Sequence, residues 1–103
     1  MSEAQQPPSR EGSVVMDIGG DTGALVVYTP EILAGAEIEI ARRGEATTFV
    51  HTEVRERRLP QGSLFAGVFP GVPAGDYSLL AVASLPSVDF SVAGGQVSEI
   101  TWA

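Results

Sequence analysis

A corner rich in proline and glycine, at residues 70–75, constrains the fold of this chain more than any other feature. It separates two apolar runs of strand length, residues 64–69 and 76–83. Proline removes a backbone donor that a strand ladder needs, and glycine permits the positive φ of a tight reversal. The segment therefore predicts two strands joined by a corner. Its expected structural residues are Pro73, Gly75 and Tyr77.

The block at residues 90–102 predicts a hairpin that turns at Gly94–Gly95. A plain two-residue loop would pair Phe90 with Glu99, which is a poor match for a buried face. One extra residue, held as a bulge, would pair Phe90 with Ile100 instead. We therefore expect a bulged hairpin.

Alternation of apolar and polar residues predicts the other strands. The cleanest case is Ala36–Ile40, where Ile38 and Ile40 are expected inside and both glutamates, Glu37 and Glu39, in water. Ala24–Tyr28 is apolar on both faces, so we expect it at the centre of a sheet. The remaining expected strands are Val14–Ile18, Thr47–Arg57, Val88–Val92 and Val97–Trp102.

Composition agrees with a single all-β domain. The 103 residues are 44% hydrophobic and 18% charged, and 12 Gly and 7 Pro supply the turns that many short strands need. We expect an antiparallel Greek-key sandwich of about seven to eight strands over residues 13–103. Residues 1–12 are polar and contain two prolines, which predicts a flexible N-terminal tail.

Charge and residue content exclude several functions. A net charge of -7 argues against a nucleic-acid partner, because phosphate binding needs clustered cations. The chain has no Cys, Lys or Asn, so it has no thiolate or Schiff-base chemistry. With one His, we expect no metal site and no cofactor; Asp17 and Asp21 are interpreted as turn residues rather than calcium ligands. The absence of a signal peptide and of a membrane span predicts a cytoplasmic protein.

Five segments together resemble a known family. They are Gly-Ala-Leu-Val-Val (23–27), Leu-Ala-Gly-Ala-Glu-Ile-Glu-Ile (33–40), His-Thr-Glu-Val (51–54), Pro-Ala-Gly-Asp-Tyr-Ser-Leu (73–79) and Phe-Ser-Val-Ala-Gly-Gly-Gln-Val (90–97). Over residues 22–102 the chain resembles the prealbumin-like (transthyretin-like) sandwich domains, which include carboxypeptidase regulatory-like and collagen-adhesin B-type modules. The resemblance implies a scaffold, spacer or binding module, with Tyr77 anchoring the core.

Two activities of that family do not carry over. The isopeptide bond of adhesin modules needs Lys and Asn, which this chain lacks. The hydroxyisourate hydrolases need several His and Arg residues and a Tyr-Arg-Gly-Ser ending, whereas this chain has one His and ends Ile-Thr-Trp-Ala. Residues 14–30 also resemble the start of small stand-alone proteins of high-GC bacteria, some of them labelled phospholipases. This chain has no Gly-x-Ser-x-Gly elbow that a hydrolase base could serve.

The strongest candidate site is a cluster of arginines within a window of seventeen residues. Its members are Arg42, Arg43, Arg55, Arg57 and Arg58. A hairpin would bring them onto one sheet region, where their guanidinium groups could hold a carboxylate or phosphate. The alternative is that they pair with neighbouring glutamates on a solvated face. His51 is either a surface residue or a base, and Trp102 either caps the core or stacks on a sugar.

These observations favour a non-enzymatic binding or interaction module that uses the arginine cluster to hold an acidic ligand or protein surface. No catalytic residue is assigned. One alternative is a small hydrolase of the esterase or phospholipase type that depends on His51. The other is a structural domain that forms homo-oligomers through its edge strands.

Overall fold

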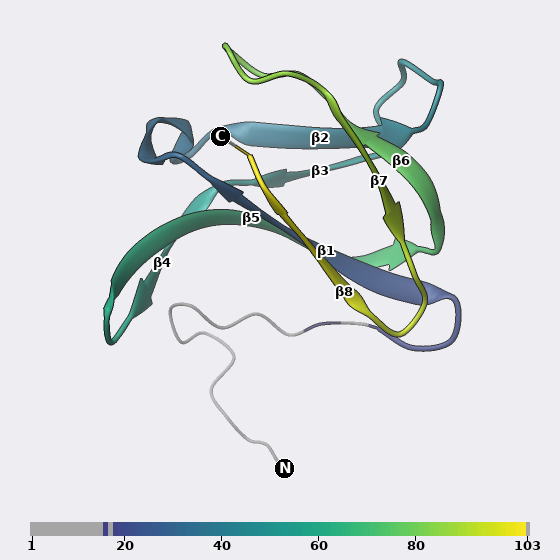
Figure 1. Cartoon of the computed structure of the whole chain (residues 1–103), viewed down its shortest axis with the longest axis horizontal. Helices are drawn as coiled ribbons and strands as arrows, with labels where there is room; N and C mark the ends of the chain where they lie inside the picture. The colour runs from purple at the N-terminus through teal and green to yellow at the C-terminus, as the bar shows by residue number, and fades with distance from the viewer. Residues whose placement is uncertain (1–15, 17, 103) are drawn as a thin grey trace.

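The structure of the chain, a computed structural model, describes Met16 and residues 18–102. In this part of the chain, eight strands form two packed sheets, and one short 3-10 helix lies outside them (Figure 1). The strands are β1 (Thr22–Thr29), β2 (Glu37–Arg42), β3 (Val50–Glu53), β4 (Arg55–Leu59), β5 (Gly62–Pro73), β6 (Gly75–Leu79), β7 (Val88–Val92) and β8 (Val97–Thr101), and the 3-10 helix is η1 (Glu31–Leu33). The predicted all-β sandwich is confirmed. The expected tail at 1–12 and most of the expected strand at Val14–Ile18 lie outside the described residues.

Each sheet has four strands, and the chain moves repeatedly between them. The strand order is β4-β5-β1-β8 in the first sheet and β3-β2-β6-β7 in the second. Consecutive strands pair as hairpins in β2–β3, β4–β5 and β6–β7, and every other connection crosses between the sheets. The three hairpins are antiparallel, as are the pairings of β1 with β5 and of β2 with β6, whereas β1 and β8 pair in parallel.

Two strand predictions hold as expected. Ile38 and Ile40 on β2 are fully buried and Glu37 is exposed, whereas Glu39, also expected in water, is only partly exposed. β1 lies between β5 and β8, and its residues Ala24–Val27 are all buried. Strand alternation therefore predicts which side chains face the interior.

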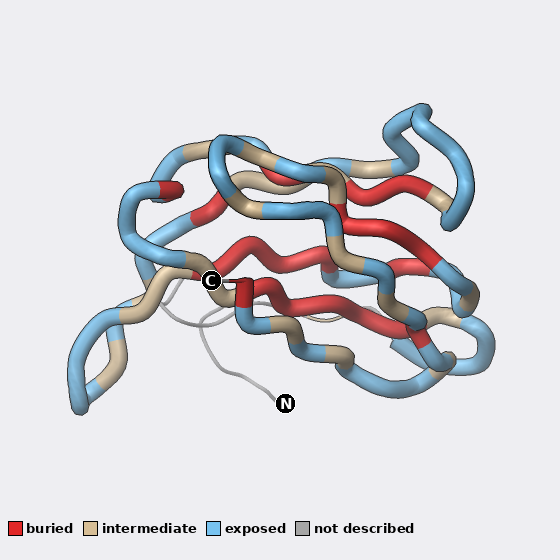
Figure 2. Tube along the Cα trace, turned by 45° about the horizontal axis from the view of Figure 1, so that its top comes forward, coloured by how far each residue is buried: buried red, intermediate tan, exposed pale blue. Residues whose placement is uncertain are grey.

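The core lies between the sheets, where buried segments of facing strands appear in red in Figure 2. Its largest fully buried side chains are Trp102, Tyr77, Phe69, Leu25, Ile38, Ile40, Leu79, Val27, Val54 and Val72. Burying one such aliphatic or aromatic side chain contributes about 1.5–3 kcal/mol. The sheet strands that carry candidate functional residues are therefore held on a packed scaffold.

The single strand expected at Thr47–Arg57 is wrong. Val54 divides it into β3 of the second sheet and β4 of the first. The Val54 side chain is fully buried, its N–H donates to Ala36 O at 2.9 Å, and its carbonyl accepts from Gly35 N at 2.8 Å. Because the alternation of side chains continues through Val54, the sequence pattern does not reveal that the chain changes sheets there.

The expected corner at residues 70–75 is also too long. β5 continues to Pro73, and only Ala74 separates it from β6. Leu25 pairs with Phe69 and Gly23 with Val72, so two residues of β5 oppose one of β1. This is a β-bulge, and a proline that lacks an N–H is tolerated at a bulge.

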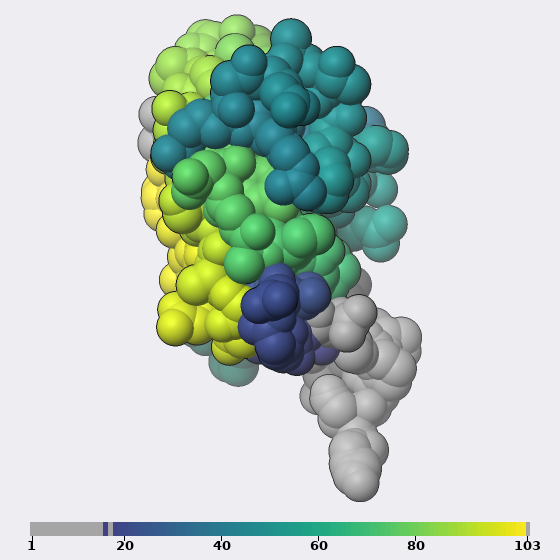
Figure 3. All heavy atoms as spheres, turned by 90° about the vertical axis from the view of Figure 1, so that its right-hand side faces the viewer, coloured from purple at the N-terminus to yellow at the C-terminus, as the bar shows by residue number. Residues whose placement is uncertain are grey.

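The predicted bulged hairpin at residues 90–102 does not form. β7 pairs with β6, whereas β8 pairs with β1 in the other sheet. Gly94 and Gly95 instead lie in the connection that crosses from β7 to β8 in the other sheet. Gly95 has φ +74° and its N–H donates to Thr22 O at 2.9 Å. A Cβ on Gly94 would lie 2.0 Å from Gly20 O, so only glycine fits there. Figure 3 shows this crossover, in yellow, beside the purple turn that precedes β1.

Candidate functional site

The edge strand β4 carries three of the five predicted binding arginines. β4 pairs with β5 on one side only, and the β4–β5 hairpin projects from the body of the sandwich (Figures 1 and 2). Arg55 and Arg57 pair with Ala66 and Leu64, so they lie on the outer face of the first sheet. Arg58 lies on the opposite face of the strand, as does Glu56. The strand therefore presents two arginines on one face and one on the other.

Arg57 is the most unusual of these side chains. Its Nη2 donates to Ala66 O at 3.3 Å, and its Nε is buried with no hydrogen-bond partner. Burial lowers the pKa of Arg57, and the neighbouring charge of Arg55 lowers it further. None of the described carboxylates pairs with Arg57. Within the described part of the chain, a cation thus lies on this face without a compensating anion.

The outer face beside Arg57 is apolar, whereas outer faces of sandwiches are ordinarily polar. We name it the outer apolar cluster; its members are Val26, Ala66 and Val68, with Met16, Tyr28 and Leu64 packed against them. At its β8 side, the Tyr28 hydroxyl donates to Glu99 Oε2 at 3.2 Å. Burial raises the pKa of Tyr28, and the hydrogen bond to Glu99 raises it further.

The other two arginines of β4 do pair with nearby acids. Arg55 Nη2 lies 3.3 Å from Glu53 Oε1, and Arg58 Nε lies 3.9 Å from Glu56 Oε2. Exposed pairs of this kind contribute at most about 1 kcal/mol, so an incoming acid can compete for either arginine. The alternative of pairing with neighbouring glutamates is therefore realised for Arg55 and Arg58, but not for Arg57.

Arg42 and Arg43 are not brought to the β4 edge. Arg42 is the last residue of β2 in the second sheet and Arg43 follows it, whereas β4 belongs to the first sheet because the chain changes sheets at Val54. The prediction that all five arginines share one sheet region is therefore wrong. The Arg42 guanidinium carbon lies 4.6 Å from the Phe49 ring centroid and 5.4 Å from that of Tyr77.

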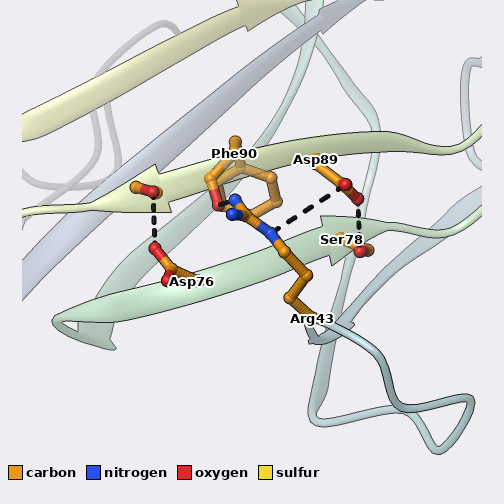
Figure 4. A network of polar contacts seen from close by, with 6 residues as sticks. Arg43, Asp76, Ser78, Asp89 and Phe90 are labelled. Atoms are coloured by element: carbon orange, nitrogen blue, oxygen red, sulfur yellow. Dashed lines mark hydrogen bonds and ion pairs between the residues drawn. The ribbon is translucent and has the colours of Figure 1, made fainter.

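Arg43 belongs to a polar network on the outer face of the second sheet (Figure 4). Its Nη2 donates to Phe90 O at 2.7 Å, and its Nε lies 4.0 Å from Asp89 Oδ2. Asp89 also accepts a hydrogen bond from Ser78 Oγ at 2.7 Å, and Asp76 accepts one from Ser91 Oγ at the same distance. These contacts join β2, β6 and β7, so Arg43 has partners within the fold.

His51 lies on β3, on the outer face of the second sheet. Its Nδ1 is 2.5 Å from Glu37 Oε1, and both side chains are more than half exposed. Among the described residues, no serine or threonine hydroxyl bonds to the ring. The arrangement supplies a base and a carboxylate but no adjacent nucleophile.

The predicted structural residues lie in or beside the core. The Tyr77 ring is fully buried, and its hydroxyl donates to Pro73 O at 2.6 Å. Trp102 is 2% exposed, and its Nε1 donates to Pro86 O at 2.8 Å. Trp102 therefore caps the core and offers no platform for a sugar. Gly75 begins β6 next to Arg42, where a Cβ would lie 3.7 Å from Nη1.

Sequence reasoning missed two features of the surface. The run Ala24–Tyr28, which is apolar on both faces, carries the signal of the outer apolar cluster, but the same pattern is typical of any central strand. The stacking of Arg42 on Phe49 joins a strand end to the end of a loop, and no periodic pattern predicts such a contact.

Comparison with family models, curated proteins and solved structures finds no match to this chain. In the part of the chain that the structure describes, no helix has the length and apolar character to cross a bilayer. The same residues contain no group of three or more His, Cys, Asp or Glu side chains arranged to hold a metal ion.

Proposed function

We propose that the protein is a non-enzymatic binding module, a prealbumin-like sandwich that takes up an acidic, extended polypeptide segment along the open edge of β4. The observation that carries this proposal is Arg57, a partly buried guanidinium on the outer face that has no carboxylate partner among the described residues. Arg55 lies two residues away on the same face.

The open edge of β4 is suited to accept a further strand. An edge strand leaves alternate N–H and C=O groups unpaired, and an extended peptide binds by completing that ladder. β4 has three arginines among its five residues, on a chain whose net charge is -7. Positive charge along an edge disfavours pairing with neutral or basic strands and favours an acidic one. The edge therefore selects its partner by charge.

The spacing of the arginines also suits a strand. Because side chains alternate, Arg55 and Arg57 point to the same face about 7 Å apart along the strand, and two acids at alternate positions of a partner strand have the same spacing. A guanidinium can grip a carboxylate through two parallel hydrogen bonds.

The prealbumin-like part of the proposal is supported by the Pro-Ala-Gly-Asp-Tyr corner. Pro73 ends β5, Gly75 begins β6, and the Tyr77 hydroxyl bonds back to Pro73 O. A tyrosine that ties a corner to the strand start is a recurrent device of Greek-key sandwiches.

The proposal is tested with a synthetic ten-residue peptide that alternates Glu with Val, and with its Gln-for-Glu counterpart. We expect the acidic peptide to bind with a Kd of roughly 1–100 μM that weakens as salt rises, and the neutral peptide to bind at least ten times more weakly. The double variant Arg55→Gln/Arg57→Gln should lose binding at least tenfold without a change in thermal stability. Arg58→Gln is the matched control on the opposite face and should change the Kd less than about twofold. Equal binding of both peptides, or equal loss in Arg58→Gln, would contradict the proposal.

The homo-oligomer is the rival occupant of the same edge. Light scattering of the wild-type protein together with the double variant distinguishes the two. A dimer that the double variant dissociates would assign the β4 edge to a second copy of the chain and overturn the acidic-peptide proposal.

A hydrolase remains the second candidate function, and one contact favours it. The His51–Glu37 pair provides a base oriented by a carboxylate. Hydrolysis of p-nitrophenyl acetate by the wild-type protein, compared with His51→Ala, tests it. Turnover that His51→Ala abolishes would establish an esterase, whereas equal background rates in both proteins would exclude one that depends on His51.

A further inference from the structure

The end of the sandwich where β2 leads into the β2–β3 loop contains a second arginine, Arg42, that has no acidic partner among residues 18–102 or Met16. This loop, residues 43–49, packs over the start of β6, and its blue-green atoms lie above the green atoms of that segment in Figure 3. Arg43 N donates to Asp76 O at 3.1 Å and Phe49 N donates to Ile40 O at 2.8 Å, so the backbone at both ends of the loop is held. The loop therefore presents Phe49 at a defined place beside Arg42.

The Arg42 guanidinium is held by rings rather than by acids. Its carbon lies 4.6 Å from the Phe49 centroid and 5.4 Å from the Tyr77 centroid, and those two ring centroids are 5.8 Å apart. Tyr77 is fixed in turn by its hydroxyl bond to Pro73 O and by stacking on Phe90. A cation–π contact orients the plane of a guanidinium but uses none of its in-plane N–H donors.

Those donors have no partner among the described residues. The Arg42 side chain makes no hydrogen bond or ion pair with the described part of the chain, although Arg43 beside it makes both. Acids on the neighbouring strands have other partners: Glu39 accepts from Thr48 Oγ1 at 2.9 Å, and Asp76 accepts from Ser91 Oγ. A planar set of donors is thus oriented and left unused.

The Arg42 and Phe49 side chains are both accessible to a ligand, because neither residue is buried. Phe49 is 42% exposed, so much of its ring surface is open to solvent. Gly75 adjoins Arg42 Nη1 and has no side chain to cover it. A carboxylate or phosphate can engage two guanidinium N–H groups at once, and a planar ring attached to that anion can rest on the exposed part of Phe49.

We propose that Arg42 and Phe49 form a binding site for a small aromatic acid, in which Arg42 holds the anionic group and Phe49 contacts the ring. This site is separate from the β4 edge and does not depend on the function proposed for it. Because the chain is acidic overall, non-specific attraction of anions is weak, and binding there requires a specific positive site.

The test is a titration of the full chain with benzoate and with phenyl phosphate, followed by NMR, with acetate and inorganic phosphate as probes that lack the ring. We expect saturable binding of an aromatic acid with a Kd of about 1 mM or below, and at least tenfold weaker binding of the matching acid without a ring. The shifts should centre on the Arg42 Nε–H and the Phe49 ring protons. A preference for benzoate or for phenyl phosphate identifies the anionic group.

Two variants and a control distinguish binding from a structural role. Arg42→Gln should weaken binding at least tenfold, and Phe49→Leu should remove most of the advantage of the aromatic acids while leaving the Arg42 charge in place. Because Phe49 is partly exposed, Phe49→Leu remains informative even where Arg42→Gln disturbs the fold. Arg58→Gln removes an equal charge from the other sheet, outside both proposed sites, and should leave the Kd within twofold. The absence of saturable binding by either aromatic acid, or an equal loss in Arg58→Gln, would overturn the proposal.

Discussion

Replacing Tyr77 with phenylalanine removes one hydroxyl group from the core and leaves the ring in place. That hydroxyl donates to Pro73 O at 2.6 Å, and the Tyr77 side chain is fully buried. A hydrogen bond of this kind contributes about 0.5–1.5 kcal/mol net, and a carbonyl left without its donor adds to the loss. We expect the free energy of unfolding to fall by about 1–2 kcal/mol. With an unfolding entropy of about 2.1 cal/mol/K per residue, the Tm of this 103-residue chain should fall by about 5–10 °C.

The measurement is urea unfolding, supported by thermal unfolding, of Tyr77→Phe beside Tyr28→Phe. The control removes the same atom from the other tyrosine of the chain, whose hydroxyl bonds to Glu99 at the surface. That change should cost less than about 0.5 kcal/mol, because it leaves no buried group unpaired. Equal losses in the two variants, or a loss below about 0.5 kcal/mol in Tyr77→Phe, would refute the role assigned to the corner.

Three other predictions follow from single residues. The raised pKa of Tyr28 means that the folded state binds the phenol proton more tightly than the unfolded state does. Stability should therefore be intact below pH about 10 and decline as pH rises through the folded pKa. Tyr28→Phe should reduce that decline in alkaline unfolding curves. Arg57→Met keeps the apolar stem and removes a buried Nε that lacks a hydrogen-bond partner among the described residues. Urea unfolding should therefore show a free energy of unfolding that is unchanged or raised by up to about 1 kcal/mol. A decrease of about 1 kcal/mol would count against the description of Arg57. Gly94→Ala places a methyl group against Gly20 O and should lower the free energy of unfolding by about 2–3 kcal/mol or more in the same assay. Gly95→Ala has open space around the new methyl group but a positive φ, and should lower it by about 1–2 kcal/mol.

Local alternation predicted the faces of the strands because each side chain responds to its own surroundings. Ile38 and Ile40 are buried as expected, and Val88, Phe90 and Val92 point inward from β7. The pattern carries no information about which sheet a strand joins, because two-residue periodicity is the same in both.

The errors in pairing have this common origin. The pattern continues unbroken through Val54, where the chain crosses between sheets, and the Gly94–Gly95 pair is compatible with either a hairpin or a crossover. The arginine cluster was divided for the same reason. Its sequence window spans the crossover, so Arg42 and Arg57 lie on different sheets.

The parallel pairing of β1 with β8 gives the sandwich a defined mechanical response. Residues 24–28 pair in register with residues 97–101, and both strands run in the same direction. A pull applied between Thr22 and Thr101 would therefore slide one strand along the other and load their backbone hydrogen bonds together, instead of opening them one after another as in a peeled hairpin. Tension along this axis therefore loads the β1–β8 pair in shear, the geometry in which a short ladder of backbone hydrogen bonds resists force best.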